Sequence, residues 1–295
     1  MQPNRHIWSR TVDHKRRNRR SIIFYSALEP ERWDDAVASN ADMFCFDMED
    51  STVPGRKEEA RRVCLPLFER PVERPVVRLV RMNVPRSDEG IRDLIALREL
   101  ETPPDGVVIP KVSSPEEVRW VAGLLAPCHP DLELVVLIET QEGLENARAI
   151  AKAAPQISTL FLGYADFSGE IGSDMSQNAL HHLRSRIVLA ASEAGIDSMD
   201  GPFFDPTDRE GLIAETQAVA SMGFTGKASY DAIQIPDIHA AFTPNAAQID
   251  HAERVIAAVA ASPTGMARVD GESVNKANVK TANRIIETAE RRGVL

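Results

Sequence analysis

The sequence predicts an α/β protein: a (β/α)8 TIM barrel followed by a C-terminal helical extension. Eight short apolar runs alternate with helix-forming stretches, which is the pattern of a parallel barrel. Polar residues follow the C-terminal ends of these runs all round the expected barrel. In a doubly wound open sheet, the main alternative, they would gather at one switch point. A barrel needs about 250 residues, which the 295-residue chain supplies with sequence to spare.

The expected strands are runs rich in β-branched and aromatic residues, bounded by turn signals. They are Ser21–Ser26, Asp42–Asp47, Val76–Met82, Gly106–Lys111, Glu133–Glu139, Ser158–Gly163, Gly195–Asp200 and Phe224–Lys227. Because the C-terminal ends of barrel strands meet at one rim, we expect the polar residues there to share an opening. These residues are Asp47, Arg81, Asn83, Lys111, Glu139, Asp166, Asp200 and Lys227.

Start and stop signals mark the expected helices. Ser114 precedes Pro115 and two glutamates, an order that favours a helix N-terminus, and Gly195 and Gly223 stand where helices end. The helices expected in the barrel are Pro30–Asn40, Arg56–Glu69, Ser87–Leu100, Pro115–Leu125, Gly143–Ala154, Gln177–Ala194 and Asp208–Met222.

Two more helices are expected after the barrel. Pro244–Ala261 has Thr243 or Asn245 as its cap, Asp270-Gly271 marks a turn, and Val274–Arg292 is the last helix. We therefore divide the chain into an N-terminal arm (1–20), a barrel (21–242) and a helical extension (243–295). The extension could pack on a neighbouring subunit, cover a site or simply pack on the surface.

Composition narrows the function classes. A net charge of −10 argues against general nucleic-acid binding, and no apolar run approaches the ~20 residues of a membrane span. Three cysteines without a CxxC pair favour reduced thiols and a cytoplasmic protein, with Cys45 in the core. The start of the chain is basic and could be a solvated arm, a phosphate contact for a polyanionic ligand or a targeting segment; it contains Arg10, Lys15, Arg16, Arg17, Arg19 and Arg20.

Glu139 and Asp166 form the strongest candidate site. Each follows an apolar run, and the 27 positions between them match one βα repeat, so both should lie side by side at the rim. Two carboxylates leave room for water and substrate oxygens around Mg²⁺, although either could instead be a helix cap or an ion-pair partner. A 2-oxo acid could chelate such a metal, which would polarise its carbonyl.

Charged residues at two neighbouring strand ends could complete this site. Asp47, Glu49 and Asp50 either cap the following helix or orient metal-bound water. Arg81 could hold a substrate carboxylate through two hydrogen bonds, or it could form an ion pair with Asp47 and Glu49.

Nine motifs in a fixed order resemble the citrate lyase β-subunit/malyl-CoA lyase group of the HpcH/HpaI aldolase family. They run from about Arg20 to about Ala289 and read R-S, F-D-M-E-D, V-R-M-N, I-P-K-V, I-E-T-Q-E-G-L, F-L-G-Y-A-D-F, L-R-S-R-I-V-L-A-A, M-D-G-P and G-F-T-G-K. The resemblance implies a TIM barrel, Mg²⁺ held by Glu139 and Asp166, Arg81 on the oxo-acid carboxylate, and a homotrimer or hexamer. It also implies cleavage or formation of a carbon–carbon bond, often on a CoA thioester, with Arg20 as a candidate CoA contact.

Three segments depart from the family pattern. The family's Pro-Gly turn after strand one is replaced by 26–30, and its Ile-His-Pro-x-Gln-Ile run after strand eight is replaced by 230–235. Asn275 stands where the CoA lyases of this group carry a proton-transferring aspartate that reaches a neighbouring subunit's site. An amide cannot transfer that proton at neutral pH.

The sequence thus predicts a Mg²⁺-dependent carbon–carbon lyase that cleaves a 3-hydroxy acid or its CoA thioester to a 2-oxo acid and an acyl product. The candidate site residues are Arg81, Asp47, Glu49, Glu139, Asp166 and Asn275. Two alternatives stay open: a CoA-independent, pyruvate-type aldolase, and a catalytically degenerate barrel that binds an oxo acid or serves as an accessory subunit.

Overall fold

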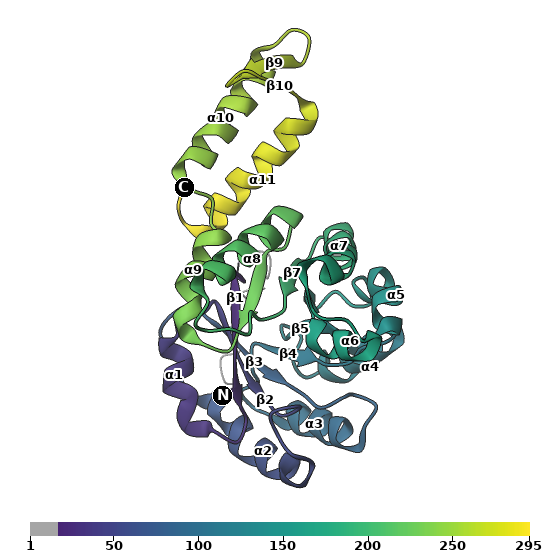
Figure 1. The fold of residues 1–295 in the computed structure, drawn as a ribbon. Coiled ribbons are helices and arrows are strands. Elements are labelled where there is room, and N and C mark those ends of the chain that lie inside the picture. Colours follow the sequence, from purple (N-terminus) through teal and green to yellow (C-terminus); the bar gives the residue numbers. More distant parts are fainter. Residues whose placement is uncertain (1–16) are drawn as a thin grey trace, which may run out of the picture.

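The computed structural model describes residues 17–295 and shows a closed barrel of eight parallel strands in sequential order (Figure 1). β1 pairs with both β2 and β8, which closes the barrel. The strands are β1 (Ser21–Ser26), β2 (Met43–Asp47), β3 (Val77–Arg81), β4 (Gly106–Ile109), β5 (Glu133–Ile138), β6 (Ile157–Leu162), β7 (Asp197–Asp200) and β8 (Gly226–Ser229). The predicted fold class is confirmed. Arg10, Lys15 and Arg16 of the predicted arm lie outside the described residues.

Helices surround the barrel, and two of them were not predicted, α6 and α9. The expected helix over 56–69 is also shorter as an α-helix, because Pro66 has no N–H to donate and the chain continues as a 3-10 helix, Leu65–Glu69. The helices are α1 (Trp33–Ala38), α2 (Lys57–Cys64), α3 (Asp88–Glu99), α4 (Pro115–Leu125), α5 (Gln141–Ile150), α6 (Tyr164–Ile171), α7 (Gln177–Ala194), α8 (Arg209–Met222) and α9 (Ile235–Ala241).

Alternation along the strands separates the inside of the barrel from its outside. In β2, Met43 and Cys45 belong to the interior cluster, whereas Phe44 and Phe46 pack outward against Trp33 of α1. The interior cluster contains Ile22, Met43, Cys45, Val77, Leu79, Val108, Val135, Leu137, Phe161, Met199 and Ala228. The lumen is therefore filled with side chains, and chemistry is confined to its ends.

Ion pairs close the N-terminal end of the barrel. Arg19, just before β1, is buried and bonds Glu133 of β5 at 2.7 Å and Asp197 of β7 at 3.1 Å. Arg291, near the end of the chain, bonds the same Asp197 through both of its carboxylate oxygens. These contacts fix the last helix to the end of the barrel where the strands begin.

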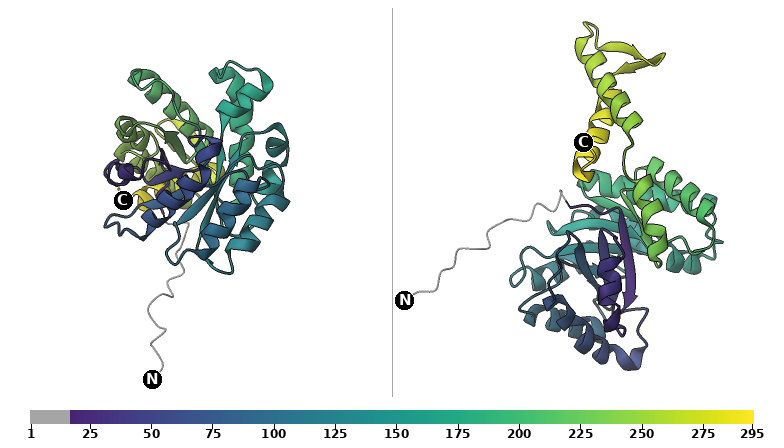
Figure 2. Two further views of the ribbon diagram at one scale, coloured as in Figure 1. Left: turned by 90° about the horizontal axis from the view of Figure 1, so that it is seen from below. Right: turned by 90° about the vertical axis from the view of Figure 1, so that its left-hand side faces the viewer.

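The chain after the barrel forms an extension of two helices and a hairpin. α10 (Ala246–Ala261) begins with a capping box at Asn245, and α11 (Lys276–Arg292) runs back toward the barrel. Between them lies the unpredicted hairpin of β9 (Met266–Val269) and β10 (Glu272–Asn275), whose turn has positive φ at Asp270 and Gly271. The views in Figures 1 and 2 agree that this extension projects away from the barrel.

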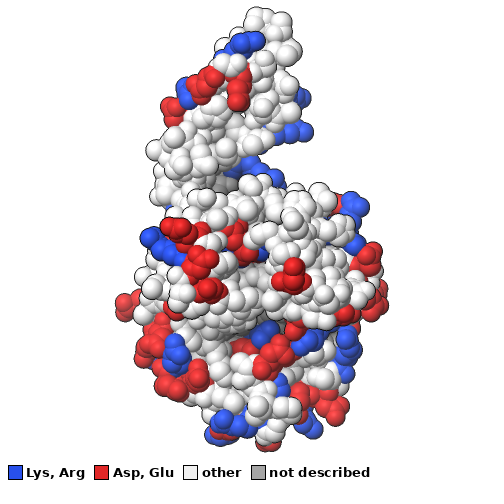
Figure 3. Space-filling view, in the orientation of Figure 1, with Lys and Arg blue, Asp and Glu red and all other residues white. Residues whose placement is uncertain are grey.

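The surface carries both signs of charge. Figure 3 shows Asp and Glu side chains interspersed with Lys and Arg, and both signs gather beside a hollow in the lower part of the molecule. No helix within residues 17–295 combines the length and apolarity that spanning a membrane would take.

Candidate active site at the C-terminal rim of the barrel

The top layer of the barrel interior is polar on three strands. Asp47 and Arg81 end β2 and β3, and Glu139 directly follows β5. Each stands two residues beyond an interior residue, namely Cys45, Leu79 and Leu137. The period of two along a strand therefore points all three side chains into the C-terminal mouth. The structure thus brings Asp47, Arg81 and Glu139 together as the sequence predicts.

Asp47 and Arg81 form a bidentate ion pair. They are direct partners in the β2–β3 register, and Nε and Nη2 of Arg81 each donate to Asp47 at 2.7 Å. Burial opposes ionisation of Asp47, but the hydrogen bonds and charge of Arg81 outweigh it and lower the pKa of this carboxyl. The same pair raises the pKa of Arg81. The ion pair that was one of the two expectations for Arg81 is therefore present in the structure. The third nitrogen, Nη1, makes only longer contacts, 3.3 Å to Glu49 and 3.7 Å to Asp50.

The acidic loop after β2 folds around Asp47. The backbone N–H groups of Glu49 and Ser51 donate to its two carboxylate oxygens, both at 2.9 Å. Both carboxylate oxygens of Asp47 therefore accept hydrogen bonds from Arg81 and from the loop, and Asp47 holds these two groups in place. Glu49 is different: Oε1 accepts from Lys111 at 2.5 Å, while its buried Oε2 accepts no hydrogen bond.

Lys111 is the central cation of the site, a role that the sequence analysis did not assign. Its ammonium lies 2.5 Å from Glu49, 3.2 Å from Asp50 and 3.9 Å from Asp166. Burial disfavours the charged form, but the bond to Glu49 outweighs it and raises the pKa of Lys111. Lys111 therefore joins the acidic loop after β2 to the carboxylates beyond β5 and β6. The I-P-K-V motif was the available signal.

Glu139 is buried beside other negative charges. Burial, together with the charges of Asp166 and Glu49, raises the pKa of Glu139 to about 8. A Cβ at Gly163 would lie 2.6 Å from Oε2 of Glu139, so glycine is needed for β6 to end this close to the carboxylate. The nearby cation, Lys111, makes its shortest contact to Glu49. The negative charge of an ionised Glu139 is therefore only partly balanced.

Asp166 lies not at the end of a strand but in the first turn of α6. β6 ends at Leu162, and α6 begins at Tyr164. The carboxylate of Asp166 is about half exposed and its charge acts on Glu139 across the mouth. The N-terminal turn of a helix also favours negative charge. Both predicted metal ligands therefore reach the same opening, Glu139 from inside and Asp166 from its edge.

The oxygen ligands at the rim suit Mg²⁺, which keeps water and substrate oxygens, better than a metal ion that needs three or more protein ligands. Within residues 17–295 no group of three or more His, Cys, Asp or Glu side chains is placed to hold a metal ion. Mg²⁺ is usually bound through one or two carboxylates plus water and substrate oxygens. Glu139 and Asp166 supply two such carboxylates, and Lys111, the only cation near both among the described residues, makes its shortest contact to Glu49. Oε2 of Glu49, which lacks a donor, could accept a hydrogen bond from a metal-bound water.

Two polar residues that were expected at the opening face the other way. Met199 and Ala228 belong to the barrel interior, so their neighbours Asp200 and Lys227 point outward. Nζ of Lys227 is fully buried and bonds Asp200 at 2.7 Å and Glu215 of α8 at 2.6 Å. This is an ion-pair network between the barrel and its helices, and the expectation that both residues share the opening is wrong.

Arg20 and Asn275 are not brought to the rim of their own subunit. Arg20 precedes β1, at the opposite end of the barrel. Its guanidinium donates hydrogen bonds to Asp42 at 2.9 Å and to the hydroxyl of Thr243. Asn275 is an exposed N-cap of α11 in the extension, where Oδ1 accepts from the N–H of Ala277 at 2.8 Å. Any contact of Asn275 with a rim site has to come from another copy of the chain.

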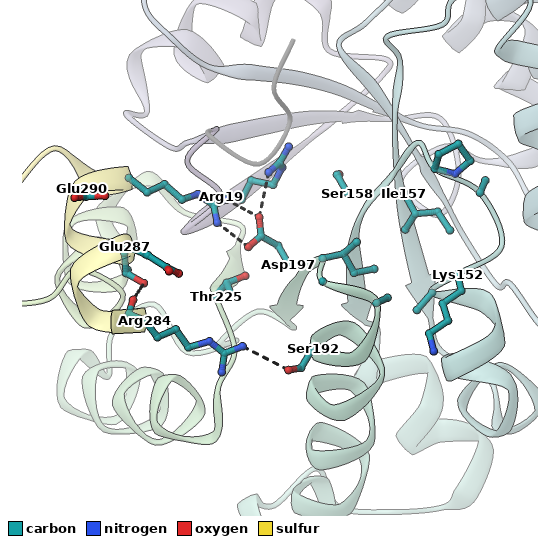
Figure 4. A pocket seen from close by; sticks show the side chains of 18 residues that line it. Arg19, Lys152, Ile157, Ser158, Ser192, Asp197, Thr225, Arg284, Glu287 and Glu290 are labelled. Carbon is teal, nitrogen blue, oxygen red and sulfur yellow. Dashed lines mark hydrogen bonds and ion pairs between the residues drawn. The ribbon is translucent and has the colours of Figure 1, made fainter. Parts of the chain in front are cut away.

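A large cavity of about 1340 Å³ lies at the opposite end, between α11 and the starts of β6, β7 and β8. Figure 4 shows Arg19 and Asp197 pointing toward each other at its wall, and Arg284 of α11 pointing to Ser192 of α7. None of Asp47, Arg81, Glu139 or Asp166 lines it. The cavity lies where the extension meets the barrel and is distinct from the rim site.

Known proteins resemble this chain in both sequence and fold. The model of the HpcH/HpaI aldolase/citrate lyase family matches residues 20–232. The chain belongs to this family. It is 33% identical to a (3S)-malyl-CoA thioesterase from Cereibacter sphaeroides over 92% of this chain and 94% of that protein. It is also 30% identical to the mitochondrial citramalyl-CoA lyase of Homo sapiens, over 85% of this chain and 78% of the human protein.

Solved structures of related proteins also have this fold. The protein CitE from Mycobacterium tuberculosis, in complex with magnesium, acetoacetate and coenzyme A, matches with a TM-score of 0.78 and 28% identity. The match covers 93% of this chain and 99% of that chain. The relatives support lyase-type chemistry with magnesium and CoA ligands, and they include both lyases and thioesterases.

Proposed function

We propose that the protein is a Mg²⁺-dependent carbon–carbon lyase that cleaves a CoA thioester of a 3-hydroxy acid to a 2-oxo acid and an acyl-CoA. The observation that carries the proposal is the convergence of Glu139 and Asp166 on one opening that also holds Arg81 and Lys111. The names of the relatives favour a thioester substrate.

Each side chain has a distinct part in this proposal. Glu139 and Asp166 would hold Mg²⁺, which when bound polarises the carbonyl of the oxo acid. Nη1 of Arg81 would take the carboxylate of the oxo acid, since its contacts to Glu49 and Asp50 are long and can be exchanged for a shorter one. Asp47 keeps the guanidinium oriented by occupying its other edge.

Lys111 would stabilise developing negative charge, and Oε2 of Glu49 would accept a hydrogen bond from a metal-bound water. The Lys111 ammonium, 3.9 Å from Asp166, can stabilise negative charge that develops beside the metal site during cleavage. Cleavage breaks the bond between the hydroxyl carbon and the acyl α-carbon; the hydroxyl loses a proton and becomes a carbonyl, and the α-carbon gains one. Asn275 cannot carry these protons.

Product analysis tests the proposal. The purified full-length chain is incubated with Mg²⁺ and malyl-CoA or citramalyl-CoA, and the products are separated. Acetyl-CoA plus an oxo acid supports the lyase, whereas free CoA plus the hydroxy acid indicates thioester hydrolysis. The Glu139→Gln variant is the control, because it keeps the fold contacts of the side chain and should lose turnover.

A CoA-independent aldolase is the second candidate, favoured by the altered segments after β1 and β8. It predicts release of pyruvate from a free 4-hydroxy-2-oxo acid without CoA. Absence of turnover in every assay would instead favour a degenerate, binding-only barrel. A homotrimer or hexamer is part of the proposal, since a second copy is what would bring residue 275 to a rim site.

A further inference from the structure

The mouth of the barrel is divided into a charged half and an aromatic half. The last residues of β2 and β3 and the segments that follow β2, β4, β5 and β6 carry the charged side chains: Asp47, Glu49, Arg81, Lys111, Glu139 and Asp166. The other part of the circle, formed by β1 and the segments after β7 and β8, carries Phe24, Phe204 and Tyr230. Because the strands follow one another in order round the barrel, these two sets occupy opposite sides of one opening.

The aromatic rings form a continuous series. Phe24 of β1 stacks on Phe161 of β6 with ring centroids 6.0 Å apart, and Tyr230 lies 6.1 Å from Phe24. Phe204 follows at 6.2 Å from Tyr230, and Tyr164 of α6 closes the series at 6.0 Å from Phe204. Tyr164 itself is buried outside the lumen, where the guanidinium of Arg184 lies 5.5 Å from its ring, so the series ends at the packing between barrel and helices.

The aromatic half touches the charged half at its other end, where Phe24 lies. The guanidinium of Arg81 lies 5.5 Å above the ring of Phe24, within cation–π distance. A ligand whose carboxylate is held by Arg81 therefore meets Phe24 and then Tyr230 as it extends across the mouth.

Two of these rings are open to solvent. Tyr230 is 60% exposed and Phe204 50% exposed, although large aromatic side chains elsewhere in the barrel, such as Phe44 and Phe46, are fully buried. Adjacent exposed rings beside a polar site are typical of a binding surface, because they offer apolar area at low entropic cost.

Charge decides what this surface can bind. The segments after β1, β7 and β8 in this half, residues 26–29, 201–208 and 230–234, contain no Lys or Arg. They do contain four acids, Glu29, Asp205, Asp208 and Asp231. Arg32, which lines a small pocket with Tyr230, gives its guanidinium to Asp35 at 2.6 Å. A second substrate carboxylate would find no cation in these segments and would be repelled by their acids, whereas an alkyl or aryl group would be desolvated against the rings.

We propose that this aromatic half, with Tyr230 and Phe204 as its exposed members, binds an apolar substituent attached to the oxo-acid part of the substrate. The preferred oxo acid then carries an alkyl or aryl group rather than a second carboxylate. This inference rests on the proposed function, in which the charged half holds the oxo acid and Mg²⁺.

Calorimetric titration in the presence of Mg²⁺ tests it with two probes that share the 2-oxo carboxylate, pyruvate and phenylpyruvate. The wild-type protein should bind phenylpyruvate about tenfold more tightly than pyruvate. The double variant Tyr230→Ala/Phe204→Ala should lose this preference and keep its affinity for pyruvate. Ile233→Ala is the matched control, because Ile233 is 70% exposed in the same segment and belongs to no ring contact.

Two further observations make the result decisive. Tyr230→Phe keeps the ring and should keep the preference, which separates stacking from a role of the hydroxyl. Equal binding of both probes by the wild-type protein would overturn the inference, as would a double variant whose preference is unchanged. If the double variant changed only the oligomeric state, the rings would form a subunit interface and the inference would also fail. Failure of the wild-type protein to bind pyruvate with Mg²⁺ would instead contradict the proposed function.

Discussion

Lys111 donates its backbone N–H to Oε1 of Glu139 at 2.8 Å, from a left-handed conformation with a φ of 52°. A residue other than glycine in this region costs of order 1 kcal/mol, so surrounding contacts have to hold it there. Two contacts do so: the N–H donates to Glu139, while the ammonium of the same residue binds Glu49 at 2.5 Å. One strained residue thus sets the position of a metal-ligand candidate and of the acidic loop.

This bond allows a clean test of metal binding. In Glu139→Gln the side-chain carbonyl can still accept from Lys111, so the fold is retained while a charge is lost. We expect Mg²⁺ affinity to fall at least tenfold, or about 1.4 kcal/mol, in this variant and in Asp166→Asn. Calorimetry measures the affinity, and Glu142→Gln, an exposed residue of α5, is the control. Undiminished binding in either site variant would remove that residue from the metal site.

Arg81→Lys should impair oxo-acid binding severely. Lysine keeps the charge but cannot satisfy Asp47 through two parallel bonds and still present a donor to the substrate. We expect a loss of about 2–3 kcal/mol in pyruvate or oxaloacetate binding. The matched control is Arg78→Lys, since Arg78 lies in the same strand but pairs with Asp105 outside the lumen. A variant that binds as tightly as the parent would leave Arg81 only its structural pair with Asp47.

Lys227→Met should destabilise the fold without touching the rim. Nζ of Lys227 is a buried partner of Asp200 and Glu215, and its removal leaves Arg184 as their one remaining cationic partner among the described residues. Breaking a buried ion pair from one side typically costs about 3–5 kcal/mol. Urea unfolding measures the loss. The double variant Lys227→Met/Glu215→Gln removes one of the stranded charges and should recover part of it. Equal stability of the parent and the single variant would contradict this account of the network.

His239 makes stability depend on pH. Its Nε2 shares a hydrogen bond of 2.7 Å with the hydroxyl of Ser21. The charged side chains that act on the ring are Asp42, Arg20, Arg74 and Arg292. Burial, together with these arginines and against Asp42, lowers the pKa of His239 to about 4 from the 6.5 of a free histidine.

The sign follows from proton binding. Above pH 6.5 the imidazole is neutral in both the folded and the unfolded chain and contributes no pH dependence. Between pH 6.5 and 4 the unfolded chain binds the proton more tightly, so the free energy of unfolding falls by about 2–4 kcal/mol in all. His239→Gln should flatten the stability profile in this window. A variant profile parallel to that of the parent would show that other groups cause the acid loss.

The strands and the top layer of the barrel were predictable because both depend on local pattern. Asp47, Arg81 and Glu139 extend interior rows of alternating residues, so their direction follows from the period of two. Asp200 and Lys227 were misplaced because a shift of one residue reverses the face, and short runs such as 197–200 do not define the parity. The role of Lys111 was missed because its backbone conformation and its partners on β2 and β5 are tertiary features.

Asn275 caps α11 in the structure and stands at the family's proton-transfer position, and the two roles can be tested separately. As the N-cap of α11 it receives the N–H of Ala277, and Asn278 returns a bond to its own N–H at 2.9 Å. Asparagine and aspartate cap helices equally well, so Asn275→Asp should leave the free energy of unfolding unchanged, while Asn275→Ala should lower it by about 1 kcal/mol.

Activity should respond differently from stability. If residue 275 reaches the site of a neighbouring subunit, an aspartate there supplies a proton carrier that asparagine cannot, and such groups contribute about 10²–10⁴-fold. We therefore expect Asn275→Asp to release acetyl-CoA from malyl-CoA or citramalyl-CoA faster than the parent at saturating Mg²⁺, with the intact oligomer used for both. Asn275→Ala should show no gain, because it removes the cap without adding a carboxylate. Brisk parental turnover that does not rise in Asn275→Asp would show that another group transfers the proton.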